Sequence, residues 1–262
     1  MAVVAIIPVR YDSTRFPGKP LATIGGKPMI QHVYESASKA RGLDRVLVAT
    51  DDRRILETVK DFGGEVVMTS KSHSSGTDRL AEVAKKIKAE WVVNVQGDLP
   101  FVRAQTIART LGPLRRDPSI FMGTAVTPIY QKEEWLNPNV VKVVTDSKGF
   151  ALYFSRAPIP YIREYEGATN GCPPTAHLEE GRILGYRHVG IYVYRRDFLL
   201  KFSRLRPTAL ERTEGLEQLR ALAHGYRIRV MHVDEPSVEV DTPEDLQKAE
   251  DYLKNIEAEG KR

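Results

Sequence analysis

The segment Val3-Val-Ala-Ile-Ile-Pro8 is an apolar run, and Arg10-Tyr-Asp-Ser-Thr-Arg-Phe-Pro-Gly-Lys19 follows it closely. A buried strand, a loop with three cations and a glycine, and then a helical pattern indicate an open α/β sheet. Ligands bind such sheets beyond the carboxyl ends of the strands. Arg10, Arg15 and Lys19, beside a glycine that allows close backbone approach, therefore predict a loop that binds polyphosphate. Its spacing differs from that of a Walker loop.

Length and composition narrow the class of protein. The chain has 262 residues, 42% hydrophobic and 28% charged, so it can bury the core of one large α/β domain. Cys172 is the only cysteine, which excludes an internal disulfide and fits a reducing compartment; we interpret it as a loop thiol. Pro8 and Arg10 end the first apolar run early, and no later run is long enough for a membrane span. We expect a soluble, cytoplasmic protein with no membrane insertion.

The charge balance favours a small anionic ligand. The formal net charge is +5, which is compatible with binding to nucleic acid or to small anions. Lysine and arginine are spread along the chain, and their clearest cluster shares the first loop with glycine and proline. Aromatic residues are not interleaved with these cations, as they are in nucleic-acid binders. We therefore expect small-molecule substrates and no nucleic-acid partner.

Alternating patterns predict the organisation of the first half of the chain. Apolar, β-branched runs alternate with helical patterns, as a parallel sheet requires. The expected strands are residues 3–8, 45–50, 65–68 and 91–96. The expected helices are residues 28–41, 53–62, 77–88 and 103 to about 116, with Pro28 as a first helical residue and Gly63-Gly64 as a stop.

The second half has a different pattern. Residues 121–127, 140–145, 150–154 and 191–194 predict strands, with a hairpin turn at Asp146-Ser-Lys-Gly149. Residues 155–182 are rich in proline, glycine and charge, which indicates a mobile or interface-forming loop. A helix near 214–224, a strand near 227–233 and a last helix from Pro243 follow. We predict one domain over residues 1–262 with an antiparallel portion inserted at about residues 120–195.

A second motif, Val92-Val-Asn-Val-Gln-Gly-Asp98, is a buried strand that ends in a glycine and a carboxylate. Asp98 is either a turn residue before Pro100 or a ligand of a hard cation such as Mg²⁺. A phosphate-binding loop at a neighbouring strand end favours the metal ligand.

A third motif is Glu239-Val-Asp-Thr-Pro-Glu-Asp245. Thr242 has the pattern of a helix N-cap with proline after it and Asp245 at the third helical position. Helix capping leaves Asp241 unexplained, and a second metal ligand and a simple turn residue are equally good interpretations of it.

The fourth motif, Ser74-Ser-Gly-Thr-Asp-Arg79, has the pattern of a helix start capped by Thr77. Its amides and hydroxyls are suited to a base edge or an anion, and a plain helix cap explains it equally well. The four motifs together favour phosphoryl or nucleotidyl transfer by positioning and charge neutralisation. The sequence has no Ser-His-Asp, Cys-His or zinc-site pattern that competes with this interpretation.

The motifs, in this order, resemble the 3-deoxy-manno-octulosonate cytidylyltransferases, also called CMP-Kdo synthetases. The resemblance runs from residue 3 to about 250. The matching blocks are residues 7–10, 13–15, 17–20, 75–79, 92–98, 137–144, 151–156, 188–192, 214–220 and 240–245.

The resemblance implies a fold, a reaction and a cofactor. The implied fold is α/β and nucleotide-diphospho-sugar transferase-like (Rossmann-like): a mixed, mostly parallel sheet, helices on both faces and an inserted antiparallel portion. The implied reaction is attack of the anomeric hydroxyl of 3-deoxy-manno-octulosonate (Kdo) on the α-phosphate of CTP, giving CMP-Kdo and pyrophosphate for lipopolysaccharide biosynthesis. The implied cofactor is Mg²⁺, and the implied assembly is a homodimer. Another sugar acid, such as a sialic acid or an amino-substituted Kdo, is the nearest alternative acceptor.

The resemblance also implies roles for individual residues. The implied CTP-binding residues are Pro8, Arg10, Arg15, Lys19, Ser75, Gly76, Arg79, Gln96 and Asp98. The implied sugar-binding residues are Gln96, Arg156, His188, Tyr192, Glu217 and Gln218. Arg10, Lys19, Asp98 and Asp241 would be catalytic, and the last two would hold the metal.

Several of these residues also have plainer interpretations. His188 is also compatible with a histidine of the core, and Arg156 with an ion-pair partner of a nearby glutamate. Glu217 is also compatible with a helix position that faces solvent. Lys142, in the matching block 137–144, is compatible with a strand face that is exposed to solvent. Leu99 stands where the family usually has an acidic residue, which leaves open how the metal is held.

Overall fold

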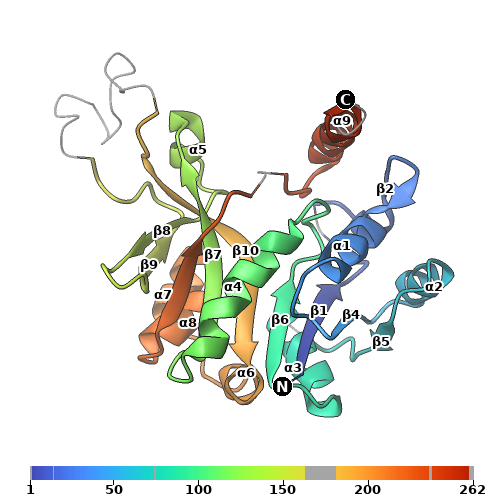
Figure 1. Ribbon diagram of the computed structural model, residues 1–262, viewed down its shortest axis with the longest axis horizontal. Helices are drawn as coiled ribbons and strands as arrows, with labels where there is room; N and C mark the ends of the chain where they lie inside the picture. The colour runs from blue at the N-terminus through green and yellow to red at the C-terminus, as the bar shows by residue number, and fades with distance from the viewer. Residues whose placement is uncertain (1, 14, 74, 163–180, 236–237, 260–262) are drawn as a thin grey trace.

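Strand β1 (Val3–Val9) lies at the centre of the sheet and pairs in parallel with β4 (Arg45–Thr50) and β6 (Trp91–Val95). The computed structural model describes residues 2–13, 15–73, 75–162, 181–235 and 238–259 (Figure 1). Over these residues, nine strands form one sheet, whose main path is β11-β7-β10-β6-β1-β4-β5. The remaining sheet strands are β5 (Val66–Met68), β7 (Met122–Ile129), β8 (Lys142–Thr145), β9 (Ala151–Ser155), β10 (Gly185–Arg195) and β11 (Ile228–His232).

The sheet is mixed and mostly parallel, as expected. Along the main path only β10 runs antiparallel, because it pairs antiparallel with both β6 and β7, whereas β11 pairs in parallel with β7. Strands β8 and β9 form an antiparallel hairpin that joins the sheet at the beginning of β10. A separate two-stranded sheet contains β2 (Thr23–Ile24) and β3 (Lys27–Pro28).

Helices cover both faces of the sheet (Figure 1). They are α1 (Met29–Ser38), α2 (Arg53–Asp61), α3 (Gly76–Lys86), α4 (Ala104–Arg116), α5 (Lys132–Leu136), α6 (Arg196–Phe202), α7 (Ala209–Glu214), α8 (Gln218–Ala223) and α9 (Pro243–Glu259). One large core cluster contains Ile7 with residues of α1, α2 and α4, and a second large cluster contains Ile6 with residues of α3, α6 and α8. Because both faces are buried, β1 is a continuous apolar run rather than an alternating one.

Local chemistry explains several element boundaries. Gly63, with a φ of 79°, follows α2, as the glycine pair predicts. The hairpin turn is confirmed, since the Gly149 amide donates to the Asp146 carbonyl at 2.9 Å. The cap of α3 differs from the prediction: the Asp78 amide donates to Oγ of Ser75 at 3.1 Å, and Thr77 lies inside the helix.

Some elements differ from the sequence-based expectation. Strand β10 covers eleven residues, although the sequence predicts only 191–194. The helix expected near 214–224 is two helices, because Gly215 ends α7 before α8 begins. Pro28 belongs to β3 and caps α1 rather than opening it. Most of the loop predicted over 155–182, including Cys172, lies outside the described residues. In the described part of the chain, no helix has the length and apolar character needed to cross a membrane.

Candidate active site

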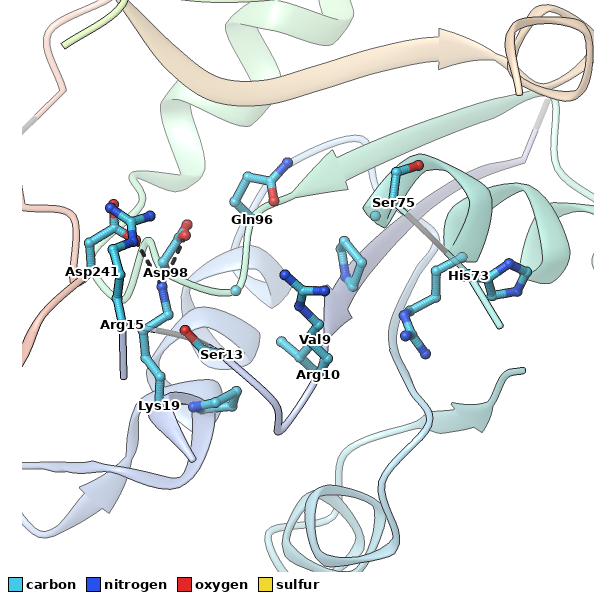
Figure 2. A pocket seen from close by; sticks show the side chains of 15 residues that line it. Val9, Arg10, Ser13, Arg15, Lys19, His73, Ser75, Gln96, Asp98 and Asp241 are labelled. Atoms are coloured by element: carbon cyan, nitrogen blue, oxygen red, sulfur yellow. Dashed lines mark hydrogen bonds and ion pairs between the residues drawn. The ribbon is translucent and has the colours of Figure 1, made fainter. Parts of the chain in front are cut away.

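A cavity of about 360 Å³ lies where β1 and β6 end and α3 begins (Figure 2). All the residues predicted to bind the nucleotide line it: Pro8, Arg10, Arg15, Lys19, Ser75, Gly76, Arg79, Gln96 and Asp98. Asp241 lines it as well, although this residue is distant in sequence. The rule that ligands bind at the carboxyl ends of parallel strands thus places this group of residues correctly.

The loop after β1 is folded back on itself, which brings Lys19 to the cavity. The Gly18 amide donates to the Tyr11 carbonyl at 2.9 Å, and Gly18 has a left-handed φ of 73°. A Cβ on Gly18 would meet the Tyr11 hydroxyl at 3.0 Å. The Tyr11 ring that contacts this turn is itself packed against Arg54, whose guanidinium lies 3.3 Å from the centre of the ring. Gly18 therefore suits this tight turn, whereas a residue with a side chain would be strained there.

Two carboxylates share one ammonium group at the edge of the cavity (Figure 2). Nζ of Lys19 lies 3.3 Å from Oδ2 of Asp98 and 3.1 Å from Oδ1 of Asp241. Arg15 adds a second cation, with Nη1 at 3.1 Å from Oδ2 of Asp241. The Val240 amide donates to the Asp98 carbonyl at 3.0 Å, so the main chain itself joins the two acidic loops.

Asp241 lies immediately before a capped helix. The Asp245 amide donates to Oγ1 of Thr242, and the Thr242 amide donates back to Oδ2 of Asp245, which forms the expected capping box. Asp241 accepts no bond in this box, and its carboxylate pairs with Lys19 and Arg15 instead. The side chain of Asp241 is therefore left to the cavity.

The loops after β1 and β6 lie unusually close together. A Cβ on Gly97 would lie 2.3 Å from Cγ1 of Val9, so a glycine is required for this approach. Leu99 is 6% exposed and belongs to the same buried cluster as Val95 and Val102. Position 99 is therefore part of the core and supplies no polar group to the Asp98 carboxylate.

A buried arginine lies at the α3 end of the cavity. Arg79 has a side chain that is only 5% exposed, and its Nη2 donates to Oδ2 of Asp51 at 2.9 Å. Nη1 of Arg79 donates to Oγ1 of Thr69. These two acceptors come from the ends of β4 and β5, so the sheet fixes the orientation of the guanidinium that lines the cavity.

Glu82 holds the loop that carries His73 against α3. Its carboxylate accepts bonds from Lys86 at 2.6 Å and from the Ser70 amide at 2.9 Å, and it lies 2.6 Å from Nε2 of His73. These bonds, with Lys86 contributing most, lower the pKa of Glu82 to about 2. His73 lines the cavity, although the sequence analysis did not single it out.

The Glu82 contacts predict a specific pH dependence of stability. The folded pKa is below the ordinary value of 4.5, so the stabilisation is complete above pH 4.5 and is lost as the pH falls toward 2. Glu82→Gln should lower the free energy of urea unfolding at pH 6, and its difference from wild type should shrink at pH 3. Glu57→Gln, on an exposed position of α2, is the matched control. A constant difference at both pH values would contradict this assignment.

A second cavity of about 320 Å³ adjoins the first and shares Arg15 and Asp241 with it. Of the six predicted sugar-binding residues, His188 lines this cavity and Gln96 lines the first. The other residues of the second cavity are Asn137, Asn139, Val140, Val141, Arg187, Gly190, Glu239, Thr242 and Asp245. The sequence analysis did not assign a ligand-binding role to any of these.

His188 is a neutral, hydrogen-bonded group. Oγ1 of Thr124 donates to the Ile191 carbonyl at 2.7 Å, so Nε2 of His188, at 2.9 Å from the same oxygen, carries the proton. Burial lowers the pKa of His188 to about 3, and the neighbouring Arg187 contributes. His188 is therefore bonded within the core and also lines the second cavity, while its contact with a sugar stays a prediction.

The remaining predicted sugar-binding residues line neither of these two cavities. Oγ1 of Thr77 donates to Glu217, so Glu217 does not simply face solvent. Tyr192 and Gln218 are 8% and 6% exposed. Nε of Arg156 donates to the Glu214 carbonyl at 2.7 Å, and its amide donates to the Glu214 carboxylate at 2.9 Å. The expected contacts of these four residues with a sugar therefore stay predictions.

The sequence profile of the cytidylyltransferase family matches residues 4–228. The chain belongs to the cytidylyltransferase family. It is 53% identical over 254 residues to the 3-deoxy-manno-octulosonate cytidylyltransferase of Geobacter sulfurreducens, covering 97% of the chain and 100% of that relative. It is 54% identical over 257 residues to the enzyme of the same name from Geobacter metallireducens, covering 98% and 100%. These relatives confirm the resemblance that the sequence motifs indicated.

Two solved structures agree with the fold. A CMP:2-keto-3-deoxy-manno-octonic acid synthetase complexed with CTP superposes with a TM-score of 0.87 at 43% identity, covering 98% of this chain and 100% of that one. A 4-diphosphocytidyl-2C-methyl-D-erythritol synthase from Anaerococcus prevotii gives a TM-score of 0.61 at 14% identity, covering 97% and 98%. The second likeness concerns the fold alone, and both support the expected nucleotide-diphospho-sugar transferase-like architecture.

Proposed function

We propose that this chain transfers CMP from CTP to the anomeric hydroxyl of Kdo, releasing pyrophosphate, and so provides CMP-Kdo for lipopolysaccharide biosynthesis. The observation that carries the proposal is the convergence of Arg10, Arg15, Lys19, Asp98 and Asp241 on one cavity. A relative named 3-deoxy-manno-octulosonate cytidylyltransferase, which is about as long as this chain and 53% identical to it, supports the choice of Kdo as the acceptor.

The basic loop is suited to the triphosphate. Within the described residues Arg10 makes no hydrogen bond or ion pair, and its side chain lines the cavity. Arg15 and Lys19 balance the two carboxylates at the other side of the same cavity. We assign these three cations to the phosphate oxygens, where they would offset the charge that develops on the leaving pyrophosphate.

The carboxylate pair fits a divalent cation. The described residues contain no group of three or more histidine, cysteine, aspartate or glutamate side chains that could hold a metal. Mg²⁺ in nucleotide-binding sites commonly takes only one or two protein carboxylates, together with water and substrate phosphates. Asp98 and Asp241, oxygen donors around one ammonium group, match that requirement. They would hold Mg²⁺, which supplies charge neutralisation at the α-phosphate.

In our proposal, the base of CTP and the sugar acid bind on opposite sides of the group formed by the three cations and the two carboxylates. Ser75, Gly76 and Arg79 would contact the cytidine, because they line the cavity at the start of α3. The second cavity would take the sugar acid, because it adjoins the phosphate side through Arg15 and Asp241. His188 lines this cavity, and we assign the choice of sugar to it together with Arg156, Tyr192, Glu217 and Gln218, as the family resemblance implies. We also propose that the portion at about residues 120–195 forms a homodimer, and that the enzyme acts in the cytoplasm.

Pyrophosphate release tests the proposed function. We expect release only when CTP, Kdo and Mg²⁺ are present together, and little release with ATP, GTP or UTP. A panel of Kdo, amino-substituted Kdo and sialic acid, compared by kcat/KM, tests the acceptor. Faster turnover of another sugar acid would overturn the assignment of Kdo, and no release from a folded protein that binds CTP would overturn the whole proposal.

A further inference from the structure

Lys142 is a charged residue completely enclosed by the protein. It lies at the beginning of β8 and is 0% exposed, so a solvated strand face, the plain interpretation of this lysine, is excluded. Its Nζ donates to three main-chain carbonyls: Asn137 at 2.8 Å, Val140 at 2.7 Å and Arg156 at 2.6 Å. These three bonds use the full donor capacity of an ammonium group.

The carbonyls belong to two segments, one of which borders the second cavity. Asn137 and Val140 are in the loop between α5 and β8, which supplies part of the cavity wall. Arg156 directly follows β9, the other strand of the same hairpin (Figure 1). Lys142 therefore ties the loop before its own strand to the chain that leaves the hairpin.

Two further bonds show that this loop is fastened at several points. Nη1 of Arg156 donates to the Pro138 carbonyl at 2.9 Å. The His188 amide donates to the Val141 carbonyl at 2.8 Å, which connects the loop to β10 beside a residue of the cavity. Lys142 lies at the meeting point of these connections, so its loss would remove the bonds from Nζ that tie the loop to the chain after β9, while leaving the Arg156–Pro138 bond and the bond to β10.

Burying an ammonium group in this space costs desolvation free energy. Burial lowers the pKa of Lys142 to about 8, and Arg156 adds to the effect while Glu214 opposes it. Within the described residues no carboxylate forms an ion pair with Lys142, so its charge is balanced by main-chain dipoles. An apolar side chain of similar volume would fill the same space with less desolvation. What it would lack is the ability to hold three carbonyls at one point.

We propose that Lys142 is a positioning residue, which holds the loop of residues 137–141 in the shape that binds the acceptor. The inference rests on the proposed function, because it takes the second cavity as the sugar-acid site. Lys142 does not line either cavity, so it acts through Asn137, Asn139 and Val140 rather than by contact with substrate.

Steady-state kinetics of Lys142→Met test the proposal. We expect the KM for Kdo to rise by about tenfold or more while the KM for CTP changes by less than about twofold, because the lost interaction concerns one cavity only. Lys142→Gln, which keeps two donors, should fall between wild type and Lys142→Met. Lys148→Met makes the same change at an exposed lysine in the turn of the same hairpin and should match wild type. CTP binding by calorimetry shows whether each variant is folded.

Amide hydrogen exchange separates this inference from the proposed function. In Lys142→Met, exchange over residues 137–141 should become about tenfold faster or more, while exchange in β1 stays as in wild type. Unchanged exchange in the loop, or an equal rise in both KM values, would overturn the inference. If wild type does not use Kdo but the loop exchanges faster in the variant, the proposed function fails and the positioning of the loop stands.

Discussion

Asp98→Asn is expected to lower kcat for cytidylyl transfer by about 10²–10³-fold, with a much smaller change in the KM for CTP. Asp98 and Asp241 both contact Nζ of Lys19 at the edge of the first cavity. The amide keeps the size of the side chain but removes the negative charge that pairs with Lys19 and that would hold Mg²⁺ in the proposed site. Pyrophosphate release at saturating CTP and Kdo, over a range of Mg²⁺ concentrations, measures the effect.

A double variant makes this prediction sharper. If Asp98 and Asp241 hold one ion together, the double asparagine variant should be only slightly slower than either single variant. Asp197→Asn, at a side chain that is 85% exposed on α6, is the matched control and should keep wild-type activity. Full activity in Asp98→Asn, or losses that simply multiply in the double variant, would exclude a shared metal role.

The part of the fold that is predictable from sequence is the part in which local patterns and tertiary environment agree. Strands β1, β4 and β6 are buried on both faces and therefore appear as continuous apolar runs. Strand β10 is harder to recognise because Arg187, His188 and two glycines interrupt its first half. Its length is set by pairing with β6, β7 and β8, which are distant in sequence.

The same distinction applies to the site. Residues that follow a parallel strand, such as Arg10 and Asp98, can be placed from sequence because their strands converge at one sheet edge. Residues of the second cavity come from the loop before β8, from β10 and from the segment before α9, and only the tertiary fold brings these parts of the chain together. Lys142 shows this most clearly, since a lysine in a strand normally faces solvent and only the surrounding loops enclose it.

Asp51→Ala is expected to lower the free energy of unfolding by about 3 kcal/mol, because it leaves a buried guanidinium without its counter-charge. The side chains of Asp51 and Arg79 are 18% and 5% exposed, and Thr69 is the other acceptor of this guanidinium. Urea unfolding at neutral pH measures the loss. The KM for CTP should rise as well, since Arg79 lines the first cavity, which we assign to the nucleotide.

The companion variants distinguish a buried ion pair from a general loss of packing. Asp51→Ala combined with Arg79→Met should recover most of the lost stability, because no charge is then left buried. Glu35→Ala removes the partner of Lys27 in an exposed pair, with side chains 38% and 48% exposed, and should cost at most about 1 kcal/mol. The double variant should still bind CTP poorly, because it lacks the guanidinium itself. Recovery of stability without recovery of CTP binding would show that Asp51 stabilises the fold by balancing the charge of Arg79, whereas no recovery of stability would assign the loss to packing.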